Sequence, residues 1–252
     1  MPIIQSVERA LLILDLFDEY NQELKITEIS AKMNLHKSTV HSLLKTLQEY
    51  RYIEQNAENG KYRLGLKLLE RSGQLTQSMD IRRTAKATLA ELSKETGQTA
   101  HLVILDGREG VYIDKVEGEK AQIRYSRIGR RIPIHCSAVG KALIAFKAPA
   151  QLEAILLNYE YRIQTERTIR NKADLLKELE RVREQGYAID DQENEPGVRC
   201  YAVPIRDHKG DVIAAVSLSM LVARVTAEEE AEYAGKLTAK GQELSRQMGF
   251  GL

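Results

Sequence analysis

Three donor-bearing side chains recur at intervals of four residues, at Lys37, His41 and Lys45. On an α-helix this spacing places them on one face. Ser38 and Ser42 stand beside them and add short hydroxyl side chains. A helix face of hydrogen-bond donors, two of them cationic, suits the reading of base edges in the major groove of DNA. Because any isolated polar helix face can simply be solvated, the neighbouring elements must decide between the two interpretations.

The net charge is only +1, but it is unevenly distributed along the chain. Residues 1–24 carry one arginine against five acidic residues, whereas residues 25–71 carry nine Lys or Arg against five. Phosphate contacts require such a local basic excess. Two of the cations, Lys61 and Arg63, fall in a predicted β-hairpin. The residues expected to contact DNA are Lys37, Ser38, Thr39, His41, Ser42, Lys45, Lys61 and Arg63.

A second group of candidate residues lies far along the chain. Ser137 is a suitable N-cap for a helix that begins near Ala138, and Gly140 adds a further small residue there. Unpaired N–H groups at a helix start favour a carboxylate, and small side chains let a ligand approach the backbone. Ser217 and Ser219 alternate with apolar residues, so on a strand both hydroxyls face one way. An interior polar pocket is favoured here over a solvated sheet face.

Two sharper interpretations involve the same region. His135, Asp190 and Cys200 could form a nucleophilic set, or could join His101 and Cys136 in a metal site. Neither arrangement has the spacing of a motif, and cysteine is ordinarily a small buried residue. We therefore expect no enzyme activity, no metal and no cofactor. The alternatives are a cytosolic enzyme or small-molecule-binding domain tethered to a DNA-binding module, and a DNA-packing protein without an effector.

Apolar periodicity predicts the elements that position the first group. In order they are helices over 7–20, 28–33 and 37–49 and strands over 52–55 and 61–64. Ser6 and Thr27 are expected as N-caps, and Asn34 tolerates the left-handed turn between the second and third helices. Three helices and a hairpin in this order predict a winged helix-turn-helix. A further helix over 65–78 predicts a linker.

The pattern changes after Asp80 to mixed helices and strands. Helices are expected over 81–96, from near Ala138, after Pro149, over 172–185 and after Thr226, and strands over 100–105, 111–116, 122–126, 199–206 and 212–219. Asn171 and Thr226 are predicted N-caps. Hairpins alternate with helices without a regular βαβ period, which favours an α+β fold with an antiparallel sheet.

Five longer segments are more specific: SVERALLILDLF, ITEISAKMNLHKSTVHSLLKTL, YRLGLKLLERS, IGRRIPIHCSAVGKALIAF and DDQENEPGVRCYAVPIRDHKGDVIAAVSLS. In these segments the chain resembles the IclR family of bacterial transcription regulators, and the resemblance covers nearly its whole length. It implies a GAF-like, profilin-like effector domain, a homodimer or dimer of dimers, and an organic-acid effector as in many members. Two departures are Ser42, where Arg is common in the recognition helix, and SMLVAR, which replaces a Gly-containing turn after the last strand.

The resemblance also implies which residues form the walls of an effector pocket. They are Ile132, Ala138, Val139, Asp190, Val198, Cys200, Ser217 and Ser219. Asp190 would repel an anionic ligand unless it accepts a hydrogen bond from a ligand hydroxyl. Hydroxy- or keto-acids are therefore expected rather than simple fatty acids.

Composition excludes several other classes of protein. The chain is 43% hydrophobic and 29% charged, which is typical of globular domains. No run approaches the roughly 18 apolar residues of a membrane helix, and the N-terminus lacks the pattern of a signal peptide. Two cysteines without CxxC spacing make neither a disulfide framework nor a zinc finger. A cytoplasmic protein without a membrane partner is expected.

The sequence thus predicts a separate function for each part of the chain. Residues 1–64 are expected to form the winged helix-turn-helix DNA-binding domain, 65–79 a linker helix, and 80–252 an effector-binding and oligomerisation domain. One recognition helix covers only a half-site, so a homo-oligomer on a near-palindromic operator in double-stranded DNA is expected. The predicted function is transcription regulation, by repression rather than activation, under the control of a small carboxylate-bearing metabolite.

Overall fold

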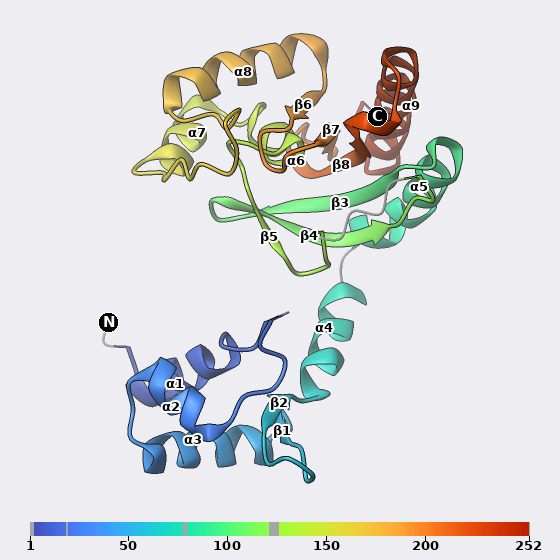
Figure 1. Ribbon diagram of the computed structural model, residues 1–252. Helices are drawn as coiled ribbons and strands as arrows, with labels where there is room; N and C mark the ends of the chain where they lie inside the picture. The colour runs from blue at the N-terminus through green and yellow to red at the C-terminus, as the bar shows by residue number, and fades with distance from the viewer. Residues whose placement is uncertain (1–2, 19, 78–79, 121–125, 252) are drawn as a thin grey trace. The chain divides into compact units, whose positions relative to one another are not determined.

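The computed structural model describes residues 3–18, 20–77, 80–120 and 126–251. The chain divides into two compact units, Met1–Ser78 and Met79–Leu252 (Figure 1). Each unit has its own buried apolar core. The expected α+β architecture, with a helix-turn-helix unit followed by an antiparallel sheet domain, is confirmed.

The N-terminal unit consists of three short helices, a hairpin and one further helix. In order they are α1 (Gln5–Leu14), α2 (Ile26–Met33), α3 (Lys37–Glu49), β1 (Ile53–Gln55), β2 (Tyr62–Leu64) and α4 (Lys67–Gln77). Ile13, Ile29, Leu44 and Ile53 are fully or almost fully buried and give each of the first four elements one anchor in a common core. The turn between α2 and α3 places Asn34 at φ 49°, in the left-handed region expected for it.

Two of the predicted helix starts are wrong. Ser6 lies inside α1, because the chain is extended at Ile4 and turns helical at Gln5, two residues earlier than expected. Thr27 lies inside α2, where the Lys25 backbone N–H donates to the Glu28 carboxylate at 2.6 Å and so begins the helix without a hydroxyl cap. Near the end of α1, Asp18 accepts from the backbone N–H groups of Tyr20 and Asn21, which ends the predicted 7–20 helix early.

The C-terminal unit alternates hairpins with helices. Its elements are α5 (Asp80–Thr96), β3 (Thr99–Asp106), β4 (Glu109–Val116), β5 (Arg131–Pro133), α6 (Ala138–Ile144), α7 (Pro149–Leu156), α8 (Lys172–Gln185), β6 (Ala188–Asp191), β7 (Val198–Arg206), β8 (Val212–Leu221), the 3-10 turn η1 (Val222–Arg224) and α9 (Ala227–Gln247). The predicted N-caps at Ser137, Asn171 and Thr226 are confirmed, since each side chain accepts from a backbone N–H three residues on.

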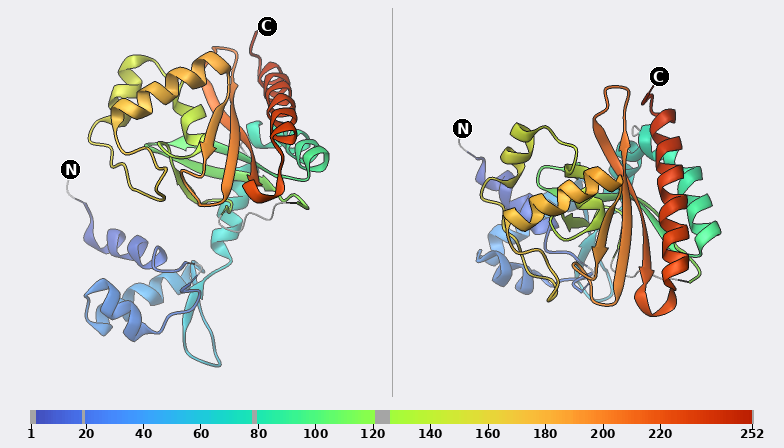
Figure 2. Two further views of the ribbon diagram at one scale, coloured as in Figure 1. Left: turned by 45° about the horizontal axis from the view of Figure 1, so that its top comes forward. Right: turned by 90° about the horizontal axis from the view of Figure 1, so that it is seen from above.

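The six strands form one antiparallel sheet in the order β5-β4-β3-β8-β7-β6. Helices α5 and α9 lie along one face, and α6, α7 and α8 lie over the other (Figure 2). The two faces bury separate apolar cores, one on each side of the sheet. The sheet is therefore the middle layer of three, and a side chain in its centre is shielded from solvent on both sides.

Sequence reasoning missed the two edge strands, β5 and β6. Both are short, β5 contains Pro133, and β6 buries Asp190 among apolar residues, so neither shows the alternation typical of a strand. The strand predicted over 122–126 lies almost wholly outside the described residues. No helix among the described residues is long and apolar enough to cross a membrane.

Candidate DNA-reading surface and buried polar cluster

Helix α3 has one buried face and one exposed face. Val40, Leu44 and Leu47 are buried in the core of the N-terminal unit. The opposite face exposes five of the predicted DNA-contacting residues, while a sixth, Thr39, is half-buried at its edge. The exposed five are Lys37, Ser38, His41, Ser42 and Lys45. The periodicity of 3.6 residues per turn accounts for both faces.

The hydroxyl groups on this face are partly committed to the helix itself. Ser42 Oγ donates to the Ser38 carbonyl oxygen at 3.1 Å, and Thr46 Oγ1 donates to the Ser42 carbonyl oxygen at 3.0 Å. Such bonds back to the preceding turn leave the oxygen lone pairs free to accept. In this arrangement Ser42 presents an acceptor outward, which differs from the donor face expected from the residue types.

The hairpin carries the two remaining predicted contacts. Arg63 forms an ion pair with Glu54 on the neighbouring strand at 3.2 Å, and both side chains are well exposed. Exposed pairs contribute only about 0–1 kcal/mol, so a phosphate can displace Glu54. Lys61 is half-buried and, like Lys37 and Lys45, has no ion pair among the described residues.

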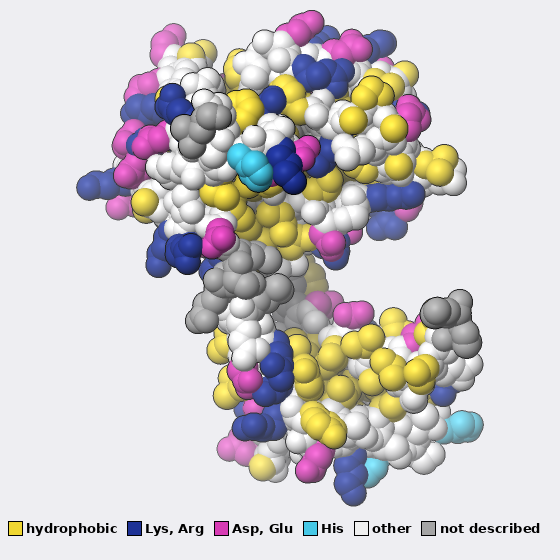
Figure 3. Space-filling view, turned by 180° about the vertical axis from the view of Figure 1, so that it is seen from behind, with side chains coloured by type: hydrophobic (Ala, Val, Ile, Leu, Met, Phe, Trp, Pro, Cys, Tyr) yellow, Lys and Arg dark blue, Asp and Glu magenta, His cyan; other side chains and the backbone are white. Residues whose placement is uncertain are grey.

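The N-terminal unit also exposes several large apolar side chains. Figure 3 shows hydrophobic side chains gathered over one face of this unit. Exposed large hydrophobic residues occur along and before α1, and just before and within α4. They are Ile3, Ile4, Val7, Leu11, Leu12, Leu66 and Leu69. An exposed patch of this kind marks an association surface more often than a solvated one.

In the C-terminal unit, five polar side chains meet in the interior and form what we call the buried polar cluster: His101, Ser126, Cys200, Ser217 and Ser219. Each is at most 7% exposed. His101 Nε2 lies 2.7 Å from Ser126 Oγ, and His101 Nδ1 lies 3.5 Å from both Ser217 Oγ and Ser219 Oγ. Cys200 Sγ lies 3.0 Å from Ser219 Oγ. The hydroxyls of Ser217 and Ser219 thus point to the same side of β8.

Strand register explains why these residues meet. His101 on β3 is directly opposite Ser217 on β8, and Ser219 is opposite Cys200 on β7. Cys200 in turn is opposite Asp190 on the edge strand β6. Four neighbouring strands therefore carry polar side chains in one band across the sheet, on the face that α6 covers.

Burial controls the protonation of the cluster and its surroundings. It lowers the pKa of His101 to about 3, with help from the charge of Lys115, so the imidazole is neutral at physiological pH. Burial and the nearby Glu193 raise the pKa of Asp190 to about 7. Tyr112, whose ring centre lies 5.1 Å from that of His101, also has a raised pKa because it is buried. The cluster is therefore an uncharged hydrogen-bonding site bordered by one carboxyl group that titrates near neutrality.

All nine predicted effector-contacting residues are buried in this unit. Ile132, Ala138, Val139, Val198 and Cys200 belong to one apolar core between the sheet and α6. Gly140 departs from expectation, because a side chain there would collide with the backbone of Ile134. Its small size serves close packing of α6 under the preceding loop, rather than the approach of a ligand.

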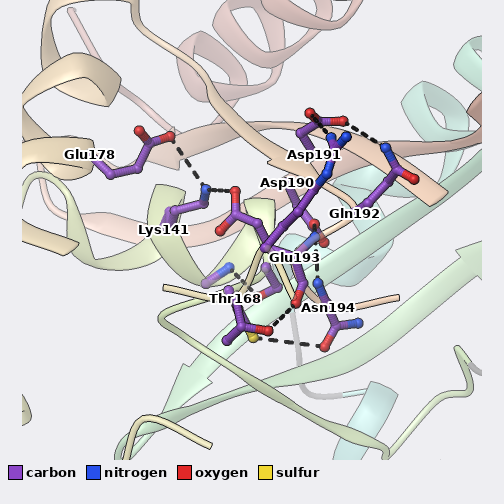
Figure 4. A network of polar contacts seen from close by, with 12 residues as sticks. Lys141, Thr168, Glu178, Asp190, Asp191, Gln192, Glu193 and Asn194 are labelled. Atoms are coloured by element: carbon purple, nitrogen blue, oxygen red, sulfur yellow. Dashed lines mark hydrogen bonds and ion pairs between the residues drawn. The ribbon is translucent and has the colours of Figure 1, made fainter. Parts of the chain in front are cut away.

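A buried lysine holds the turn that follows β6 and Asp190 (Figure 4). Lys141 on α6 is fully buried, and its ammonium group contacts Glu193 at 2.7 Å and Glu178 at 3.3 Å. Asp190 Oδ1 accepts from the backbone N–H groups of Glu193 and Asn194 at 2.7 and 3.3 Å. The turn after β6 is thus fixed from both ends, by Lys141 at Glu193 and by Asp190 beside the buried polar cluster.

A cavity of about 830 Å³ opens at the β4–β5 edge of the same unit. Ile132 is the one predicted residue that lines it, and Tyr112 and Asn194 also contribute. Tyr112 lines this cavity, and its ring centre lies 5.1 Å from that of His101 in the buried polar cluster. Most of the residues predicted to form the pocket walls therefore do not line this cavity.

His135 bonds to residues other than Asp190 and Cys200. Its Nδ1 lies 3.0 Å from the Tyr159 hydroxyl and its Nε2 lies 3.1 Å from the Arg162 carbonyl oxygen, so both ring nitrogens are occupied. Among the described residues, no three His, Cys, Asp or Glu side chains are grouped to hold a metal ion. The nucleophilic set considered from the sequence is not assembled.

Sequence reasoning considered His101 only as a member of a metal site that it did not favour, and it missed Ser126 and Tyr112 altogether. A signal was present for His101, since it is the one titratable residue in the otherwise apolar segment AHLVIL, which is predicted to form a strand. No signal marked Ser126, because its place beside His101 depends on how the chain returns after β4.

A helix-turn-helix unit with an exposed donor face, followed by a sheet domain with an interior polar site, defines a DNA-binding transcription regulator. The model of the bacterial transcriptional regulator IclR C-terminal domain matches residues 73–246, and that of the IclR helix-turn-helix domain matches residues 6–57. The chain belongs to the IclR family.

Similar proteins agree with this assignment. Over 250 residues the chain is 58% identical to the transcriptional regulator XynR of Escherichia coli, covering 99% of each chain. It is 40% identical to KdgR of the same organism, covering 98% of this chain and 94% of KdgR. The crystal structure of the Thermotoga maritima IclR protein is 36% identical, with a TM-score of 0.81, covering 98% of this chain and 99% of that one. These relatives are named as regulators and not as enzymes.

Proposed function

We propose that the protein is a repressor whose affinity for a near-palindromic operator is controlled by a small hydroxy- or keto-acid. Residues 1–64 bind DNA, 65–79 link the two units, and 80–252 bind the effector and associate with a second copy. The observation that carries this proposal is the buried polar cluster, which gathers neutral hydrogen-bonding groups in the interior of the second unit.

The chemistry of the cluster selects the class of effector. Ser217 and Ser219 donate to the ligand carboxylate, while the neutral imidazole of His101 and the Asp190 carboxyl group meet ligand hydroxyl or keto oxygens. Hydrogen bonds to a charged group contribute about 1.5–3 kcal/mol each, more than those between neutral groups. A fatty acid of the same size offers no hydroxyl or keto oxygen to His101 and Asp190, so it would gain none of these additional hydrogen bonds.

Apolar side chains complete the proposed site. Ile132, Ala138, Val139, Val198 and Cys200 form its wall, and Gly140 supports that wall from behind by letting α6 pack closely. Tyr112 lines the 830 Å³ cavity and lies beside His101, so a turn of its ring is the route by which we propose that a ligand reaches the site from solvent. Mostly apolar walls with a few fixed polar groups are typical of small-molecule sites.

On the DNA side, Lys37, Ser38, Thr39, His41, Ser42 and Lys45 enter the major groove, and Lys61 and Arg63 contact the backbone. The exposed positions of all of these α3 residues except half-buried Thr39 support this assignment. The protein acts as a homodimer or dimer of dimers, joined in part by the exposed apolar residues of α1 and α4. Sedimentation at micromolar concentration should therefore show at least a dimer; a monomer with and without DNA would contradict the proposal.

A thermal-shift screen tests the effector assignment. A ligand that binds only the native state raises the unfolding midpoint by mass action, so hydroxy- and keto-acids should raise it while fatty acids of equal length should not. The acids that do so should then weaken operator binding in a fluorescence anisotropy titration. Stabilisation by fatty acids alone, or stabilisation without any effect on DNA affinity, would overturn the proposal.

A further inference from the structure

A second cavity, of about 590 Å³, lies at the other end of the C-terminal unit, where β7 ends beside the last turns of α8 and α9. It shares no lining residue with the 830 Å³ cavity or with the buried polar cluster. Its volume falls within the range of about 300–1,000 Å³ that is usual for small-molecule sites. Gly241 allows α9 to pack closely on β7 at this cavity, because a side chain there would collide with Val203.

Three arginines line this cavity: Arg183, Arg206 and Arg246. Among the described residues that line it, none is Asp or Glu. The C-terminal ends of α8 and α9 lie nearby and contribute partial negative charge, about half an elementary charge each. Three full positive charges outweigh this, so the cavity attracts anions.

Arg206 is the best-placed of the three. Its guanidinium carbon lies 4.1 Å from the ring centre of Phe146 and 5.4 Å from that of Phe250, so two aromatic rings hold it by cation–π contact. Its side chain makes no hydrogen bond or ion pair with any described residue, although it is partly buried. Partial burial also lowers its pKa. The planar fork of donors is thus fixed in place with its hydrogen-bonding capacity unused.

We propose that this cavity binds a small multivalent anion, of the carboxylate or phosphate type, at a site separate from the effector site. Arg206 is the central ligand, and Arg246, on the exposed side of α9, closes the site from one side. Arg183 contributes charge but is partly committed, since its Nη1 donates to the Ala145 carbonyl oxygen at 2.7 Å. Guanidinium forks match carboxylate and phosphate geometry through paired N–H···O bonds, which is why one ligand class covers both.

Isothermal titration calorimetry of the full chain tests the proposal, with citrate and inorganic pyrophosphate as probes at constant ionic strength. We expect at least one probe to bind at millimolar concentration or below. Arg206→Gln and Arg246→Gln should each lower the affinity about tenfold or more, as expected for loss of a charged hydrogen-bonded contact. Arg206→Lys keeps the charge but loses the fork, so its affinity should lie between those of the wild type and Arg206→Gln.

Two controls separate this site from nonspecific charge and from the effector site. Arg170→Gln removes the same charge from an exposed loop outside the cavity and should leave binding unchanged. The double variant Ser217→Ala/Ser219→Ala should also leave it unchanged, because those serines lie in the buried polar cluster. If Arg206→Gln does not fold, Arg246→Gln decides, since that side chain is exposed. Absence of binding to the wild type, or equal affinity in the arginine-cavity variants and Arg170→Gln, would overturn the proposal.

Discussion

The DNA-reading face of α3 and the buried polar cluster contain similar residue types but differ in exposure and in how far apart their members lie in the sequence. The α3 face collects its donors within nine residues, from Lys37 to Lys45, and exposes most of them. The buried polar cluster collects its members from strands β3, β7 and β8 and from Ser126, and buries all of them. The α3 face is therefore a surface formed by one helix, whereas the buried polar cluster is part of the core of its unit.

This difference has an energetic consequence. An exposed donor is hydrogen-bonded to water in both the folded and unfolded states, so changing it alters recognition with little effect on stability. A buried donor has exchanged water for protein partners, so removing one member leaves the others unsatisfied. Variants of the α3 face should therefore change recognition of DNA with little effect on stability, whereas variants of buried polar residues should also change stability. Four measurements test this contrast.

The largest effect is expected at Lys141. Its replacement by Met leaves Glu193 buried without its cation, and breaking a buried pair in this way costs about 3–5 kcal/mol. Urea unfolding followed by circular dichroism should show a large loss of stability, with hydrogen exchange confining it to the C-terminal unit. Lys45→Met on α3 is the matched control and should change stability by no more than about 0.5 kcal/mol. Equal effects of the two variants would remove the contrast between the regions.

The next effect concerns the effector. The double variant Ser217→Ala/Ser219→Ala should lower effector affinity by about tenfold to a hundredfold for each hydroxyl lost to the carboxylate. Operator affinity in the absence of effector should stay at the wild-type value, because the serines lie in the other unit. Ser93→Ala removes a buried hydroxyl outside the cluster and should leave effector affinity unchanged. Calorimetry with the identified acid decides; an unchanged affinity in the double variant would move the site elsewhere.

A smaller effect is expected on the DNA side. Lys45→Ala should weaken binding to all sequences alike and reduce the slope of log affinity against log salt by about 0.9, the value for one phosphate contact. His41→Ala and Ser38→Ala should instead change which base is preferred at one position. Lys86→Ala, which removes an exposed charge from α5, is the control. Anisotropy titrations over a salt series would contradict the assignment if Lys45→Ala and Lys86→Ala behaved alike.

The smallest effect is a pH dependence of effector affinity. The pKa of Asp190 is raised to about 7, so its carboxyl group is protonated below that pH and ionised above it. The ionised form repels an anionic effector, whereas the protonated form donates a hydrogen bond to it. Affinity should therefore fall as the pH rises from 6 to 8, by at most about tenfold per unit for one proton. Asp190→Asn should flatten the profile; an equally steep profile in that variant would assign the titration to another group.

Much of the N-terminal unit followed from the sequence. The bounds predicted for α3 are those observed, and the left-handed turn at Asn34 is where it was expected. These features depend on periodicity and turn chemistry, which act over a few residues. The errors at Ser6 and Thr27 have the same local origin. A hydroxyl caps a helix only where its own residue is extended, but the extended residues here are Ile4 and Lys25, and the Glu28 carboxylate accepts from the Lys25 N–H in place of a hydroxyl cap.

In the C-terminal unit, the sequence determined the helices with clear caps and the hairpin that places Ser217 and Ser219 on one side of β8. It could not determine that His101 lies opposite Ser217, that Lys141 is buried against Glu193, or that Ile134 fills the space beside Gly140. Each of these contacts joins residues brought together by sheet order or helix packing. Local patterns fix which way a side chain faces; only the tertiary structure decides what it meets there, because burial and pairing are properties of the assembled core.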